Sequence, residues 1–120
     1  MMQDDRLDMD GRLLRFAADV IALAPRLQRS PTGRYLVGQM VRSGTSAGAN
    51  FQEARGAESR ADFVHKMQVV LKELRETEYW LRLLRETRVI PSGLLVGPLA
   101  EVDELIRIVV KSVVTAKAKC

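Results

Sequence analysis

Residues 39–54 read QMVRSGTSAGANFQEA, a pattern typical of a helix with two different faces. Polar residues recur in it at intervals of four, three, four and three, which places them on one face of a helix. That polar face comprises Gln39, Ser43, Ser46, Asn50 and Glu53, and the apolar face beside it comprises Leu36, Met40, Ala47, Phe51 and Ala54. Such a helix contacts its own core on one side and either a partner or a buried polar network on the other.

The same stretch holds two glycines that a simple core helix would not contain. A glycine inside a helix costs roughly 0.5–1 kcal/mol relative to alanine, so its presence calls for a compensating reason. Gly44 and Gly48 lie four residues apart on one face, where the missing side chains allow a second helix to approach closely. We expect the tightest helix contact there.

Apolar residues at helical spacing predict a first helix over residues 11–28, entered at Asp10-Gly11. Pro25 lies inside this pattern and is expected to kink the helix rather than end it, because Leu27 keeps the phase. The predicted buried stripe consists of Leu13, Leu14, Ala17, Val20, Ile21, Ala24 and Leu27.

Start and stop signals divide the rest of the chain into three further helices. Ser30-Pro31 is a capped helix start, and that helix runs to about Ala54. Ser59, followed three residues later by Asp62, resembles a capping arrangement at the start of a third helix, which stops before Pro91. A fourth helix follows Pro91-Ser92-Gly93.

Four helices joined by short loops predict an all-α fold, an antiparallel up-down-up-down four-helix bundle. We expect one bundle domain over residues 11–120, preceded by a flexible acidic tail over residues 1–10 that holds four aspartates and one arginine.

The composition is that of an ordinary soluble protein, with 47% apolar and 28% charged residues. No apolar run approaches the roughly 18 residues that a membrane span needs, and the acidic N-terminus is unlike a signal peptide, so we expect a cytoplasmic protein without membrane contact. The single cysteine, Cys120, is the last residue and predicts a solvated thiol rather than a nucleophile.

The run RSGTSAGANFQEA, residues 42–54, closely resembles the signature of the four helix bundle protein family, whose members are encoded in intervening sequences of large-subunit ribosomal RNA. The match continues at Ala57, Ser59, Asp62, Phe63, Lys66, Lys72, Glu73, Glu76, Tyr79, Trp80 and Leu81, and with the flanking helices it extends from about Leu13 to Ala116. The resemblance implies a homopentamer of antiparallel bundles without an assigned activity. A related branch, the accessory variability determinants of diversity-generating retroelements, binds nucleic acid and a reverse transcriptase through basic surfaces.

Antiparallel packing of the second and third helices across a turn near residue 57 makes facing residue numbers sum to roughly 115. This rule places Arg42 near Glu73, Gln39 near Glu76, and Asn50 near Lys66 or His65. We call the polar seam the set Gln39, Arg42, Ser43, Ser46, Asn50, Glu53, Lys66, Glu73 and Glu76. The seam is either a hydrogen-bond and ion-pair network that fixes helix register, within one subunit or between subunits, or a surface facing a ligand or RNA.

No residue pattern predicts catalysis, a cofactor or a metal. Di-iron sites of four-helix bundles need a Glu-x-x-His pair on each of two helices, and His65, with Asp62 three residues before it, is the only histidine. There is no zinc spacing, nucleophile triad or phosphate-binding loop.

The chain carries a net charge of +4, and eight arginines fall within residues 11–60. Arginines near predicted helix ends are the candidates for phosphate contacts, namely Arg26, Arg29, Arg34, Arg55 and Arg60. The sequence therefore favours a non-enzymatic oligomer that binds structured RNA or DNA through charge and with little sequence preference. The alternative is a scaffold whose basic rim docks an acidic protein, without a nucleic-acid role.

Overall fold

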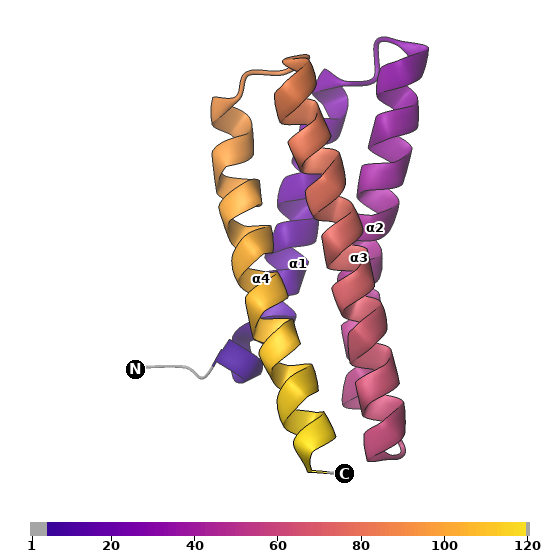
Figure 1. The fold of residues 1–120 in the computed structure, drawn as a ribbon. Coiled ribbons are helices and arrows are strands. Elements are labelled where there is room, and N and C mark those ends of the chain that lie inside the picture. The colour runs from indigo at the N-terminus through magenta and orange to yellow at the C-terminus, as the bar shows by residue number, and fades with distance from the viewer. Residues whose placement is uncertain (1–4, 120) are drawn as a thin grey trace.

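The computed structural model describes residues 5–119, which form four long helices joined by short connections (Figure 1). They are α1 (Asp5–Leu23), α2 (Pro31–Arg55), α3 (Arg60–Thr87) and α4 (Gly93–Ala118), and a 3-10 turn, η1 (Ala24–Arg26), follows α1. Successive helices run in opposite directions in Figure 1, which confirms the predicted all-α up-down-up-down bundle. The bundle is elongated, with extents of 48 × 31 × 19 Å.

The first helix begins earlier than the sequence predicts. α1 starts at Asp5, so the predicted entry at Asp10-Gly11 is wrong, and residues 5–10 of the predicted tail belong to the helix. Residues 1–4 of that tail lie outside the described residues. Met9 is only 2% exposed and lies one turn before Leu13 on the buried face, and this contact extends the helix into the acidic segment.

α1 buries a face that the predicted stripe names only in part. Its core residues are Met9, Leu13, Phe16, Val20 and Leu23. Leu14 and Ile21, which were predicted to be buried, are instead 72% and 48% exposed. The helix is apolar on two faces, and its spacing alone does not distinguish the face that packs on the other helices.

Pro25 ends α1 rather than kinking it. The α-helix stops at Leu23, and Pro25 lies in the η1 turn, because proline has no N–H to continue the helical hydrogen bonds. Leu27 nevertheless remains buried, so the prediction that it belongs to the buried stripe is confirmed although it lies after the end of α1.

Both predicted caps are confirmed. The Ser30 hydroxyl accepts a hydrogen bond from the Gly33 N–H at 3.0 Å, and Pro31 takes the first position of α2. At α3, the Ser59 hydroxyl accepts from the Asp62 N–H at 3.0 Å, and the Asp62 carboxylate accepts from the Glu58 N–H at 3.3 Å. This arrangement approximates a reciprocal capping box and defines where α3 begins.

The two glycines of the opening stretch face α1. A Cβ placed on Gly44 would lie 3.3 Å from Cγ1 of Val20, and one placed on Gly48 would lie 3.6 Å from Cβ of Leu13. The close approach of a second helix at these glycines is therefore confirmed, with α1 as the partner of α2. That this is the tightest contact of the bundle stays a prediction.

The bundle is closed by contacts between α1 and α4. Arg12 donates to both carboxylate oxygens of Glu101, at 2.7 and 3.0 Å, and lies 3.2 Å from Glu104. The hydrogen bonds that Arg12 donates to Glu101 are the largest cause of its raised pKa. Over residues 5–119, none of the helices combines the length and apolarity needed to cross a membrane.

Candidate nucleic-acid interface

The centre of the polar seam is an ion-pair cluster between α2 and α3. Arg42 donates to Glu73 at 3.2 Å and also to Glu76. The Trp80 indole N–H donates to Glu76 at 3.1 Å. Glu73 is buried whereas Arg42 is half exposed, so the guanidinium covers the buried carboxylate from the solvent side. The predicted pairing of Arg42 with Glu73 is confirmed.

Beneath the ion pairs lies a buried hydroxyl pair that sequence reasoning identified only in part. The Thr77 hydroxyl lies 2.7 Å from the Ser43 hydroxyl and 2.8 Å from the Glu73 carbonyl oxygen. Ser43 can in turn donate to the Met40 carbonyl oxygen at 3.2 Å. Thr77 was not among the predicted seam residues. A threonine within the apolar stripe of α3 nevertheless indicates a buried hydroxyl that needs a hydrogen-bond partner.

The outer part of the seam pairs differently from the prediction. Lys66 binds Glu53 at 2.7 Å, and not Asn50. Asn50 donates instead to the Ser46 carbonyl and hydroxyl oxygens at 2.9 and 3.0 Å, within α2. Gln39 makes no hydrogen bond among the described residues, and Glu76 is bonded to Arg42 and Trp80. The residue numbers of the pairs that do form between α2 and α3 sum to 115–120, close to the predicted sum of roughly 115.

These contacts show that the seam joins two helices of one chain. Ser43, Glu73 and Thr77 are its buried polar residues. Within the described part of the chain, every buried side-chain nitrogen or oxygen has a hydrogen-bond partner. Buried hydrogen bonds of this kind favour one register of α2 against α3. Whether the exposed part of the seam faces a ligand, RNA or another subunit stays a prediction.

The cluster predicts a pH-dependent contribution to stability from Glu76. Hydrogen bonds from Arg42 and then Trp80 lower the pKa of Glu76 below its usual 4.5. A carboxyl whose pKa is lower in the folded state stabilises that state at neutral pH, and this stability disappears as the pH falls through the folded pKa. We expect Glu76→Gln to lower the free energy of unfolding by about 1 kcal/mol at neutral pH.

The measurement is urea unfolding of wild type and Glu76→Gln at about pH 7 and about pH 3. The difference between the two proteins should narrow at the lower pH. Glu78→Gln is the control, because Glu78 lies in the same helix and makes no ion pair among the described residues. If the difference in free energy of unfolding between wild type and Glu76→Gln stayed constant down to about pH 3, Glu76 would not be the source of the pH dependence.

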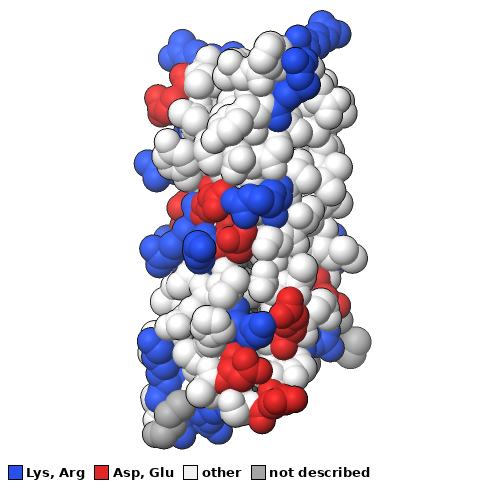
Figure 2. All heavy atoms as spheres, turned by 90° about the vertical axis from the view of Figure 1, so that its right-hand side faces the viewer, with Lys and Arg blue, Asp and Glu red and all other residues white. Residues whose placement is uncertain are grey.

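The five candidate arginines do not form one patch. Arg26, Arg29 and Arg34 lie at the end where α1 connects to α2, whereas Arg55 and Arg60 flank the turn between α2 and α3. Arg34 and Arg55 lie at opposite ends of α2, about 30 Å apart along its axis. Figure 2 shows basic side chains at both ends of the molecule and a band of mixed charge between them.

The two ends differ in how their arginines are neutralised. Arg55 lies 3.5 Å from Asp10, whereas Arg60 forms no ion pair among the described residues and is only close in sequence to Glu58 and Asp62. At the other end, no carboxylate of the described residues pairs with Arg26, Arg29 or Arg34. Among residues 5–119, the one hydrogen-bond acceptor of the Arg34 side chain is the Gln28 carbonyl oxygen, at 3.2 Å.

The up-and-down order of the helices brings a second group of arginines to that end. The last turns of α3 and the connection to α4 contribute Arg82, Arg85 and Arg88, which also lack carboxylate partners among the described residues. We call the arginine end residues 24–34 together with residues 82–92. It contains six arginines and one acidic residue, Glu86, a net charge of +5 that exceeds the +4 of the whole chain.

Sequence reasoning missed this second group, although the information was present. In an up-down-up-down bundle, the first and third connections lie at the same end. The predicted fold was thus enough to place Arg85 and Arg88 at the same end of the bundle as Arg26 and Arg29. No group of three or more histidine, cysteine, aspartate or glutamate side chains among the described residues could hold a metal ion.

Comparison with known proteins gives a family and a solved relative. A family model described as 23S rRNA-intervening sequence protein matches residues 6–111. The fold is also similar to the crystal structure of a protein with unknown function from the S23 ribosomal protein family of Bacteroides thetaiotaomicron VPI-5482. The TM-score is 0.81 at 36% sequence identity, over 87% of this chain and 96% of that one. Among curated proteins, no match was found.

Proposed function

Since this chain belongs to the 23S rRNA-intervening sequence protein family, we propose that it is a non-enzymatic protein that binds structured nucleic acid through its arginine end. The observation that carries the proposal is the net charge of +5 on that end, without carboxylate partners among the described residues. The binding is weak and has little preference for sequence, because guanidinium groups contact the phosphates that every sequence shares.

Physical chemistry favours the arginine end over the rest of the surface. An arginine already paired with a carboxylate must give up that partner before it can contact a phosphate. Within the described part of the chain, no carboxylate pairs with Arg26, Arg29, Arg85 or Arg88, so these arginines have no such partner to lose. Each phosphate contact releases condensed counterions, so binding depends steeply on salt. The protein acts in the cytoplasm under this proposal and makes no membrane contact.

Self-association belongs to the same proposal, with five subunits as the family resemblance implies. It is supported by large apolar side chains that one chain leaves in water, including Leu14 on α1 and Val96 on α4, which are 72% and 67% exposed. Tyr35 and Tyr79, both exposed, meet the half-buried Trp80 edge to face at 6.4 and 5.2 Å. In a ring with cyclic symmetry, the arginine ends of all subunits lie at the same height along the symmetry axis. Together they would form one positively charged rim.

The test is a titration of labelled structured RNA and duplex DNA at roughly 50 and 200 mM salt. Wild type should bind at low salt and lose affinity steeply at the higher concentration. Replacing Arg26, Arg29 and Arg34 together with glutamine should weaken binding at least about tenfold and lower the salt slope by about 2 to 3.

The matched control removes three arginines that are exposed and already paired. Arg15, Arg55 and Arg107 lie within 3.1–3.5 Å of Asp8, Asp10 and Asp103 respectively. Their replacement by glutamine removes the same charge and should change affinity less than about threefold. Unchanged affinity in the first triple variant would contradict the proposal. Capture of an acidic protein from the source cell that survives nuclease treatment would favour the scaffold alternative.

A further inference from the structure

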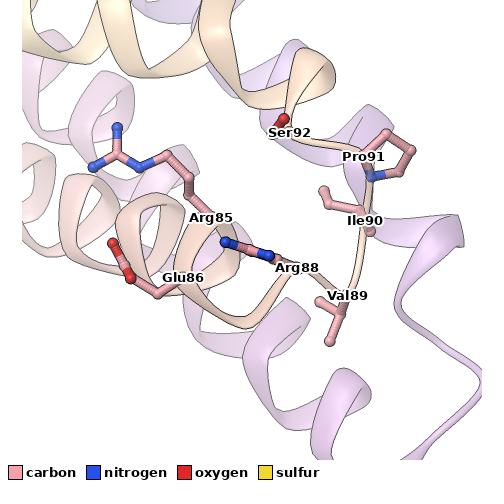
Figure 3. Close-up of a pocket in the computed structure, with 7 residues that line it drawn as sticks. All are labelled: Arg85, Glu86, Arg88, Val89, Ile90, Pro91 and Ser92. Atoms are coloured by element: carbon pink, nitrogen blue, oxygen red, sulfur yellow. The ribbon is translucent and has the colours of Figure 1, made fainter.

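The arginine end contains an open pocket at the turn between α3 and α4. It has a volume of about 830 Å³, within the range of roughly 300–1,000 Å³ that small-molecule pockets occupy. Arg85 and Arg88 line one part of it, and Val89, Ile90 and Pro91 line another (Figure 3). The pocket therefore combines two guanidinium groups with an apolar wall.

The backbone of Arg88 is unusual for its residue type. Arg88 follows the last residue of α3 with φ 57° and ψ 26°, the left-handed conformation. Among residues 5–119, it is the only residue other than glycine with a positive φ. Glycine normally occupies this position after a helix, because an L-residue is disfavoured there. An arginine thus occupies a position where glycine would end the helix with less strain.

No carboxylate among the described residues pairs with either guanidinium of the pocket. Figure 3 shows the Arg88 side chain pointing from the turn toward the part of α3 that carries Arg85. Glu86 is the one acidic side chain that lines the pocket, and it forms no ion pair with another described residue. Val89 is 55% exposed, so the apolar wall includes a side chain that the bundle core does not use.

We propose that this pocket holds a single unpaired nucleotide of the bound strand, an inference that rests on the proposed function. Arg85 and Arg88 contact its phosphate, and Val89 with Pro91 contacts its sugar or base. A bare phosphate would leave the apolar wall unused, whereas a nucleotide in a duplex could not bring its base to that wall. The pocket contains no aromatic side chain and therefore does not discriminate between bases by stacking.

The experiment compares two labelled RNAs, a blunt duplex and the same duplex with a short single-stranded overhang. Wild type should bind the overhang RNA several-fold more tightly than the blunt duplex. Arg88→Gly and Arg85→Gln should each remove this preference. Arg88→Gly should keep or raise the Tm, because glycine suits the left-handed position, so a loss of binding cannot be attributed to unfolding.

Arg82→Gln is the matched control, because it removes one charge from the same end outside the pocket. It should weaken binding of both RNAs equally and preserve the preference for the overhang. A wild type that binds both RNAs equally, or pocket variants that behave like Arg82→Gln, would overturn the pocket assignment and leave the proposed function standing. Failure of wild type to bind either RNA at low salt would overturn both.

Discussion

Replacing Gly33 by alanine is expected to lower the free energy of unfolding by about 3 kcal/mol. A Cβ at this position would lie 1.9 Å from the carbonyl oxygen of Leu27 and 2.9 Å from its carbonyl carbon. Both atoms belong to the backbone of the connection between η1 and α2, so no side chain can swing away. The alanine must displace that connection or distort the first turn of α2, where the Gly33 N–H donates to Ser30.

Gly38 is the matched control in the same helix. A Cβ there meets nothing within 4 Å, and alanine is the better helix former. Gly38→Ala should therefore raise the free energy of unfolding by about 0.5–1 kcal/mol. Urea unfolding of wild type and both variants measures the two effects. If Gly33→Ala and Gly38→Ala changed the free energy of unfolding equally, the short distance from the Leu27 carbonyl would not be the reason for glycine at position 33.

Gly44→Leu is expected to destabilise the bundle by about 3 kcal/mol, through the packing of α2 on α1. The first carbon of the new side chain would already lie 3.3 Å from Val20, closer than ordinary contact. Gly44 and Val20 are both buried, so the remaining carbons can be accommodated only if the two helices separate. Separation would expose the core side chains of α1.

Gly48→Ala provides the comparison one turn along the same face. Its Cβ would lie 3.6 Å from Leu13, an ordinary contact, so stability should be unchanged or rise by up to about 1 kcal/mol. Thermal unfolding of both variants checks the pair. If Gly44→Leu kept the wild-type Tm, the idea that Val20 leaves no room for a larger side chain at position 44 would be wrong.

The helices were predictable where local chemistry determines them. Ser30-Pro31 and the spacing of Ser59 and Asp62 marked two helix starts that the structure confirms. Caps act over a few residues, so sequence alone suffices to place them. The start of α1 depended on the burial of Met9, a tertiary contact that the acidic composition of residues 1–10 obscured.

The candidate site was less predictable, because it depends on which helix faces meet. Arg42 and Glu73 were paired correctly from the antiparallel rule, because the short turn between α2 and α3 limits which residues of the two helices can lie opposite each other. Leu14 was assigned to the core because α1 has a second apolar face, and spacing does not reveal which face packs inward. The arginine end consists of two segments about 50 residues apart in the sequence. A search for arginines that are close in the sequence therefore found the first segment and missed the second.

The contact between Arg12 and Glu101 has a consequence for the order in which the bundle assembles. These residues are 89 positions apart, whereas Arg42 and Glu73 are 31 apart. Closing the longer loop from a flexible chain costs about 0.9 kcal/mol more in entropy. Helices that follow one another in the chain can thus meet at a lower entropic cost than α1 and α4, whose joining completes the ring of four.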